Sequence, residues 1–115
     1  MELSESQRND LMEFQSLQQQ LQVVVMQKQQ LQMASAEIDR ALEASSTSTG
    51  KLYRSVGSIL VQKEPDVLKK ELSSEKEMVK LRVDSLGKQE EKLKTRLTEI
   101  QDKFEKSMPD AGKRK

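Results

Sequence analysis

The residue types that most often perform enzyme chemistry are missing from this sequence. It contains no histidine and no cysteine, so the usual general bases, thiol nucleophiles and transition-metal ligands are absent. Gly50 is followed by lysine, as in a phosphate-binding loop, but Ser45 and Leu52 stand where that loop requires glycine and Ser or Thr. The neighbouring carboxylates Glu90 and Glu91 lie in a charged helical stretch and are interpreted as surface groups. The sequence therefore predicts no enzyme activity, no metal site and no cofactor.

The composition predicts long helices in place of a globular core. Among 115 residues, 34% are hydrophobic, 34% are charged and only three are aromatic. Such a balance, rich in Gln, Glu, Lys and Leu, is typical of coiled coils. The length allows one domain, residues 1–115.

Charge and hydropathy narrow the classes of partner and compartment. Twenty basic residues against nineteen acidic ones give no electrostatic case for nucleic acid. The longest apolar run, Val23–Met26, is too short to cross a membrane, and no signal peptide is recognised. We expect no membrane partner and a cytoplasmic protein, which the lack of cysteine also fits.

A first helix is predicted over residues 4–45. Ser4 followed by Gln7 has the spacing of a capping box, and the hydroxyl-rich stretch 45–50 should end the helix. Apolar residues recur at alternating intervals of three and four, which favours a coiled-coil stripe, or seam. Its ten positions are Phe14, Leu17, Leu21, Val24, Lys28, Leu31, Ser35, Ile38, Leu42 and Ser45.

A second helix is predicted over residues 65–108, followed by a tail at 109–115. Pro65 suits the first helical position and Asp66 the positive end of the helix dipole. Gly87 lies off the seam and has no explanation in the sequence. The second seam comprises Leu72, Lys76, Val79, Val83, Leu86, Glu90, Leu93, Leu97, Ile100 and Phe104.

Seams of equal period and similar length predict that the two helices pair as an antiparallel hairpin. Centring the fold on the connector places residue i within a few residues of residue 111 − i, so Ser35 should lie near Lys76. Each arm of some forty residues would be roughly 60 Å long, with both chain ends at its tip. The alternative, a parallel coil between two chains, would need a helix that continues through residues 45–65.

The connector, residues 46–64, has the character of a β-hairpin. Gly57-Ser58 has the Gly-X form of a type II′ turn, which predicts strands at 52–56 and 59–63 with Val56 opposite Ile59 and Leu52 opposite Lys63. Leu52, Val56, Ile59 and Val61 should then form an apolar face. Because an isolated hairpin is marginal in water and leaves two open edges, we expect it to pair with other subunits. Packing back on its own helices is the alternative. The predicted assembly residues are Leu52, Tyr53, Val56, Gly57, Ile59, Leu60 and Val61.

The run from Leu52 to Val61, LYRSVGSILV, between two long helices resembles the β-class subunits of prefoldin, closest to the archaeal form. The stretches FQSLQQQLQ at 14–22 and KQEEKLKTRL at 88–97 agree with this likeness. The resemblance implies one prefoldin-like domain in a hexamer of two α and four β subunits. Hairpins from all subunits would join into β-barrels.

The resemblance also implies an ATP-independent chaperone that binds unfolded proteins and delivers them to a group II chaperonin. Its partners would be the prefoldin α subunit, other β subunits, unfolded proteins and the chaperonin. We expect apolar groups at the arm tips to bind unfolded proteins, although Phe14 and Phe104 also fit coil packing. These candidates are Leu3, Leu11, Met12, Phe14, Phe104 and Met108.

Two other functions use the same architecture. A structural or tethering oligomer would assemble without an α partner and would not protect unfolding proteins. A coiled-coil arm that binds RNA would need a basic stripe, whereas the first helix is acidic, with seven acids and three bases through residue 45.

Overall fold

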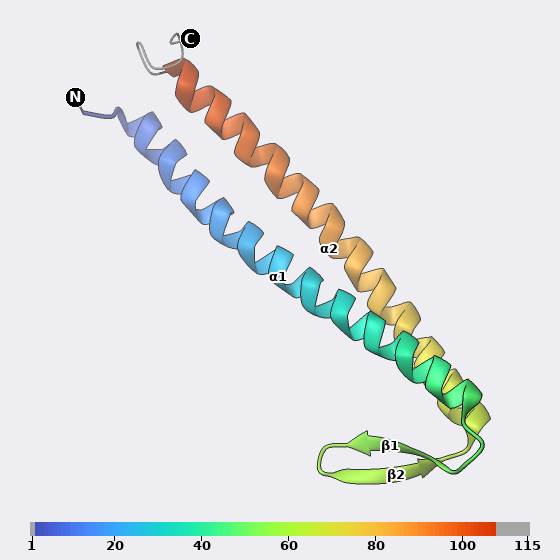
Figure 1. The fold of residues 1–115 in the computed structure, drawn as a ribbon. Helices are drawn as coiled ribbons and strands as arrows, with labels where there is room; N and C mark the ends of the chain where they lie inside the picture. Colours follow the sequence, from blue (N-terminus) through green and yellow to red (C-terminus); the bar gives the residue numbers. More distant parts are fainter. Residues whose placement is uncertain (1, 108–115) are drawn as a thin grey trace. The chain divides into compact units, whose positions relative to one another are not determined.

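The computed structural model describes residues 2–107. Two long helices are connected by a two-stranded hairpin, as predicted (Figure 1). The elements in chain order are α1 (Glu5–Thr47), β1 (Leu52–Val56), β2 (Ile59–Lys63) and α2 (Pro65–Ser107).

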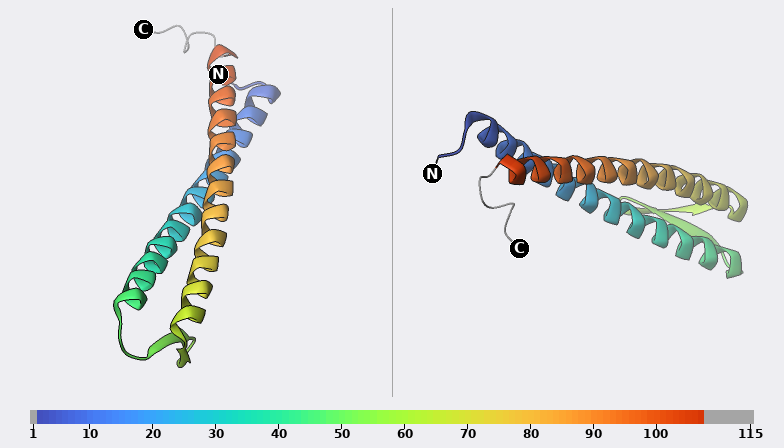
Figure 2. Two further views of the ribbon diagram at one scale, coloured as in Figure 1. Left: turned by 90° about the vertical axis from the view of Figure 1, so that its right-hand side faces the viewer. Right: turned by 90° about the horizontal axis from the view of Figure 1, so that it is seen from above.

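The chain divides into two compact units, each containing part of both helices. The hairpin unit comprises residues 28–84 and includes β1 and β2. The end unit comprises, among the described residues, 2–27 and 85–107. Within the end unit, the beginning of α1 and the last part of α2 run antiparallel (Figure 2).

The beginning of α1 is fixed by a reciprocal cap. The backbone N–H of Gln7 donates to the hydroxyl of Ser4 at 3.0 Å, and the N–H of Ser4 donates to Oε1 of Gln7 at 2.9 Å. These are the two hydrogen bonds of a capping box, which satisfy amides that have no partner within the helix. The sequence prediction for this terminus is confirmed.

The other end of α1 lies two residues beyond the predicted one, at Thr47. The hydroxyls of Ser45 and Ser46 donate to the carbonyls of Leu42 and Glu43 at 2.9 and 2.8 Å. These side chains therefore bond to the last turns of the helix before the chain leaves it. Such bonds compete with the regular helical pattern, so the hydroxyl-rich stretch still ends the helix.

Burial follows the predicted seams in both helices. All twenty predicted seam positions are buried or half-buried. The most buried apolar residues in the helices lie on these seams, except for Leu68, one turn before the second seam begins. They are Val24, Leu68, Leu72, Leu86 and Ile100.

The register between the helices agrees with the predicted one to within a few residues. Lys76 pairs with Asp39 in the hairpin unit, where the prediction placed it near Ser35. In the end unit, Lys103 pairs with Asp10, two residues from the predicted position. A heptad repeat aligns one seam with another but leaves the alignment along the helices to polar pairs and the connector.

The hairpin has the predicted pairing throughout. Val56 lies opposite Ile59, and Leu52 opposite Lys63. Gly57 has a φ of 61°, a conformation that side chains with a Cβ rarely adopt. Ser58 does not have a positive φ, so the turn is type II′ and not type I′, which needs positive φ at both central residues.

Gly87 lies within α2 and has no close neighbour that would explain it. A Cβ built on this residue meets no atom within 4 Å apart from its own chain neighbours and the helix backbone. A close approach of another part of the described chain is therefore not the reason for glycine here.

Candidate functional site

The hairpin exposes apolar side chains on one face and at its turn. The face formed by Tyr53, Ser55, Leu60 and Gln62 is entirely exposed. Tyr53 and Leu60 are 54% and 71% exposed, beside paired polar residues. A two-stranded sheet of ten residues cannot bury this surface against itself.

The predicted apolar face of the hairpin is divided by burial. Leu52 and Val61 are half-buried, whereas Val56 and Ile59, beside the turn, are 51% and 59% exposed. Burial on this face is therefore confined to the end of the hairpin farther from the turn. Of the seven predicted assembly residues, Gly57 forms the turn, two are half-buried and four are exposed apolar residues.

Two charged residues on the same face as Leu52 and Val61 form ion pairs with α2. The guanidinium of Arg54 lies 3.2 Å from Oε1 of Glu71 and 2.6 Å from Oε2 of Glu75. Nζ of Lys63 lies 2.8 Å from Oε2 of Glu71. Glu71 thus accepts a charged partner from each strand. This cluster could not be predicted from the sequence, because its members are separated along the chain and resemble ordinary surface charges.

The ion pairs shift the pKa values of Glu71 and Arg54. The hydrogen bond from Lys63 holds the pKa of Glu71 below its ordinary value of 4.5, and the positive charges of Lys63 and Arg54 act in the same direction. The hydrogen bond to Glu75 raises the pKa of the Arg54 guanidinium.

The titration of Glu71 gives a direct check on these contacts. A carboxylate whose pKa is lowered by folding stabilises the folded state above its unfolded pKa, and this contribution is lost as the pH falls through the folded pKa. We therefore expect docking of the hairpin on α2 to weaken below pH 4.5. In an NMR titration, the Glu71 midpoint should lie below 4.5 and rise toward it in Lys63→Gln. A midpoint at or above 4.5 in the unsubstituted chain would contradict the contacts.

The beginning of α1 and the end of α2 are called the helix ends here. The binding residues predicted there fall into two groups. Leu11 and Met12 are exposed, at 40% and 67%. Leu3, Phe14 and Phe104 are half-buried. Met108 lies outside the described residues. The exposed pair is accessible to another chain without any rearrangement, whereas the phenylalanines also pack between the helices.

A groove of about 220 Å³ lies between the helices in this part of the end unit. Apolar side chains from both helices line it, including the almost fully buried Ile100. The structure therefore brings three predicted residues to one place, with acids and an amide at the margin. The lining residues are Asp10, Leu11, Phe14, Ile100, Gln101, Phe104 and Glu105.

The seam continues beyond its predicted first residue, Phe14, toward the N-terminus. Asp10 is buried and accepts a hydrogen bond from Lys103 at 3.3 Å. Gln7 donates from Nε2 to the carbonyl and hydroxyl of Ser107, both at 3.1 Å. Gln7 and Asp10 were not predicted as seam positions, because they are polar and interrupt the apolar pattern. The spacing of three and four residues from Phe14 back to Leu3 was the available signal.

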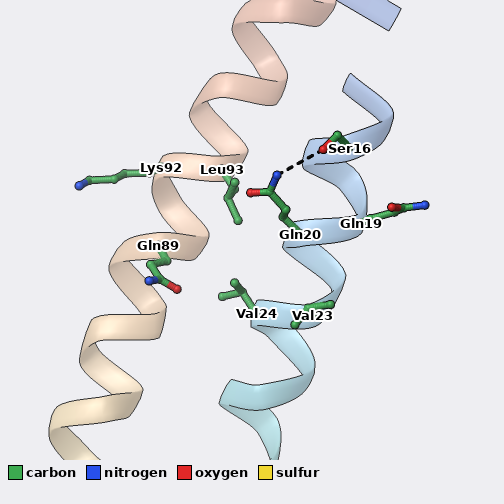
Figure 3. Close-up of a pocket in the computed structure, with 8 residues that line it drawn as sticks. All are labelled: Ser16, Gln19, Gln20, Val23, Val24, Gln89, Lys92 and Leu93. Carbon is green, nitrogen blue, oxygen red and sulfur yellow. Dashed lines mark hydrogen bonds between the residues drawn. The ribbon is translucent and has the colours of Figure 1, made fainter. Parts of the chain in front are cut away.

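A second, wider groove of about 640 Å³ lies in the middle of the end unit (Figure 3). Val24 and Leu93 point into the space between the helices, and Gln20 bonds to Ser16 at 3.3 Å. Lys92 points away from this space. Uncharged side chains dominate the lining, and this groove brings together no set of groups suited to acid–base or nucleophilic chemistry.

The described helices and carboxylates indicate neither a membrane span nor a metal centre. Neither α1 nor α2 is apolar enough over a sufficient length to cross a membrane. Within residues 2–107, no three potential ligands of the Asp, Glu, His and Cys types come together in a way that could hold a metal ion.

Comparison with known proteins identifies the family. Residues 8–111 match the prefoldin subunit family. The chain is 36% identical over 114 residues to prefoldin subunit beta of Archaeoglobus fulgidus, covering 96% of this chain and 98% of that protein. It is 32% identical over 104 residues to the Pyrococcus furiosus protein of the same name, with coverage of 87% and 89%.

A solved structure agrees with the sequence relatives. The crystal structure of the prefoldin beta subunit from Thermococcus strain KS-1 matches with a TM-score of 0.84 at 29% identity. The match covers 94% of this chain and 96% of that one. The helix–hairpin–helix order, the residues that form it and these relatives lead to one conclusion: the chain belongs to the prefoldin subunit family, as a member of its β class.

Proposed function

We propose that this protein is an ATP-independent holdase subunit that binds unfolded proteins at the helix ends and passes them to a group II chaperonin. Membership of the prefoldin family supports a prefoldin-type chaperone role. The observation that carries the binding proposal is the exposed side chain of Leu11, which lines an apolar groove and is followed by the exposed Met12.

The proposed binding mode follows from the chemistry of these groups. An unfolded protein exposes apolar side chains in no fixed order, so its binding surface must tolerate many shapes. Methionine suits this purpose because its side chain is flexible and polarizable. Helix ends are also the least stable parts of helices, so fraying there would let Phe14 and Phe104 exchange packing between the helices for contact with a bound chain.

The proposed assembly uses the hairpin. Family membership supports a hetero-oligomer with other prefoldin subunits. We propose that its partners are two α subunits and three further β subunits. Each β subunit would supply one hairpin and each α subunit two. Together they would provide sixteen strands, enough for two eight-stranded barrels. Closed barrels leave no free strand edges.

The proposal includes no nucleotide cycle and places the protein in the cytoplasm. Gly50 does not have the spacing of a phosphate-binding loop. Release would then depend on competition between the helix ends and the chaperonin for the unfolded protein.

Truncation of the helix ends tests this proposal. A chain without residues 1–12 and 105–115 should assemble with an α-type subunit as the full chain does, because the hairpin is retained. Its complex should no longer suppress aggregation of a thermally unfolding substrate, followed by light scattering. Undiminished suppression by an intact complex of truncated subunits would exclude binding at the helix ends.

A further inference from the structure

Four charged side chains connect both strands of the hairpin to one stretch of α2. Arg54 from β1 contacts Glu71 and Glu75, and Lys63 from β2 contacts Glu71. The closest N–O distances are between 2.6 and 3.2 Å, and the four side chains are 25% to 41% exposed. The strands are thus held to the same helix turns by partly shielded charges.

The spacing of the carboxylates matches the face of the hairpin that turns toward them. Glu71 and Glu75 are four residues apart, so they project from the same side of α2 on successive turns. Arg54 and Lys63 lie on the same face of the sheet, because the pairing places Arg54 opposite Val61 and Lys63 opposite Leu52. The opposite face, which carries Tyr53 and Leu60, is left entirely exposed.

We propose that Glu71 and Glu75 are positioning residues for assembly, which hold the hairpin on α2 so that its strand edges and its Tyr53–Leu60 face are presented to the hairpin of a neighbouring subunit. This inference rests on the proposed assembly through hairpins. It adds that the orientation of the hairpin is set within each subunit before subunits meet, and it names the groups that set it.

The reason such a device matters lies in the small size of the hairpin. Two strands with a half-buried end have little apolar contact to fix their direction relative to the helices. If only a fraction of free subunits holds the hairpin in the orientation that assembles, the apparent dissociation constant rises in inverse proportion to that fraction. Ion pairs that favour this orientation therefore strengthen assembly without touching the partner.

The proposed effect depends on salt. The Debye length falls from about 10 Å at 0.1 M to about 3 Å at 1 M ionic strength, and partly exposed ion pairs weaken accordingly. At low salt, we expect Glu71→Gln with Glu75→Gln to raise the concentration needed for half-assembly with an α-type subunit by about tenfold, the combined effect of three modest pairs. At 1 M salt, the double variant and the unsubstituted chain should converge.

The experiment compares matched variants of the full chain. Glu77→Gln removes an exposed carboxylate from the same helix, one that has no hydrogen-bond or ion-pair partner among residues 2–107, and should leave half-assembly unchanged. Arg54→Gln removes two of the three pairs from the hairpin side and should shift half-assembly in the same direction. Exchanging all four charges (Arg54→Glu, Lys63→Glu, Glu71→Arg and Glu75→Arg) should restore most of the lost assembly.

The outcomes separate this inference from the assembly proposal. Circular dichroism first establishes that each variant retains its helices; if the double variant does not, Arg54→Gln and the four-charge exchange carry the test. Equal half-assembly of the folded carboxylate or Arg54 variants and the unsubstituted chain at low salt would overturn the inference. A shift of the same size at 1 M salt would do so too, since it would reflect lost packing. Failure of the unsubstituted chain to assemble would instead overturn the proposed assembly.

Discussion

Serine in place of Tyr53 and Leu60 should leave a helical chain that no longer assembles with an α-type prefoldin subunit. Both residues lie on the fully exposed face of the hairpin, and together they supply its largest apolar side chains. Burying a large apolar side chain contributes about 1.5–3 kcal/mol. Loss of two such contributions should raise the dissociation constant of each contact between neighbouring subunits by a factor of at least about 100.

The assembly prediction has a matched control in the same unit. Met78 and Leu81 are 65% and 67% exposed, but they lie on α2 and not on the hairpin. Serine at both positions removes a similar amount of exposed apolar surface and should leave assembly unchanged. Sedimentation of each chain mixed with an α-type subunit distinguishes the pairs of variants. Normal assembly of the Tyr53–Leu60 variant would show that this face does not carry the interface.

Substitution of serine for Leu11 and Met12 should produce a complete complex that protects unfolding proteins poorly. Both side chains are exposed near the beginning of α1, Leu11 lines the 220 Å³ groove, and the change leaves the hairpin unaltered. Each partly exposed side chain should contribute about 1 kcal/mol to binding an apolar segment. We expect the concentration needed to suppress aggregation by half to rise about tenfold or more, measured by light scattering with a thermally unfolding substrate.

Exposed apolar residues elsewhere on α1 provide the control for this second prediction. Met26 and Met33 are 57% and 67% exposed, and neither lines the groove at the helix ends. Serine at both positions should leave protection unchanged if binding is confined to the ends. An equal loss in the two pairs of variants would indicate that exposed apolar residues along the length of α1 bind unfolded proteins.

The sequence predicted the parts of this fold that depend on local pattern. Alternating intervals of three and four residues identified both seams, because burial on a helix repeats with that period. Gly57-Ser58 identified the turn and, with it, the pairing of every strand residue, since a two-residue loop fixes the register of a hairpin. Likewise, Ser4 with Gln7 and Pro65 marked where the helices begin.

The features that were missed depend on contacts between distant parts of the chain. Arg54 and Glu71 are seventeen residues apart, and nothing in the local pattern distinguishes them from solvated charges. Asp10 is a buried carboxylate that interrupts an apolar repeat, so the pattern ended before it. The exact alignment that pairs Lys76 with Asp39 has the same origin, because equivalent heptads allow several alignments and the pattern predicts the register only to within a few residues.

The most direct test of the account is to mix this chain with an α-type prefoldin subunit and determine the mass of the product by native mass spectrometry. The same product is then assayed for protection of an unfolding substrate without ATP. The account predicts a complex of two α and four β subunits that suppresses aggregation, while the chain alone does not form it. A chain that assembles only with itself, or a mixed complex that gives no protection, would contradict the central claim and favour a structural role.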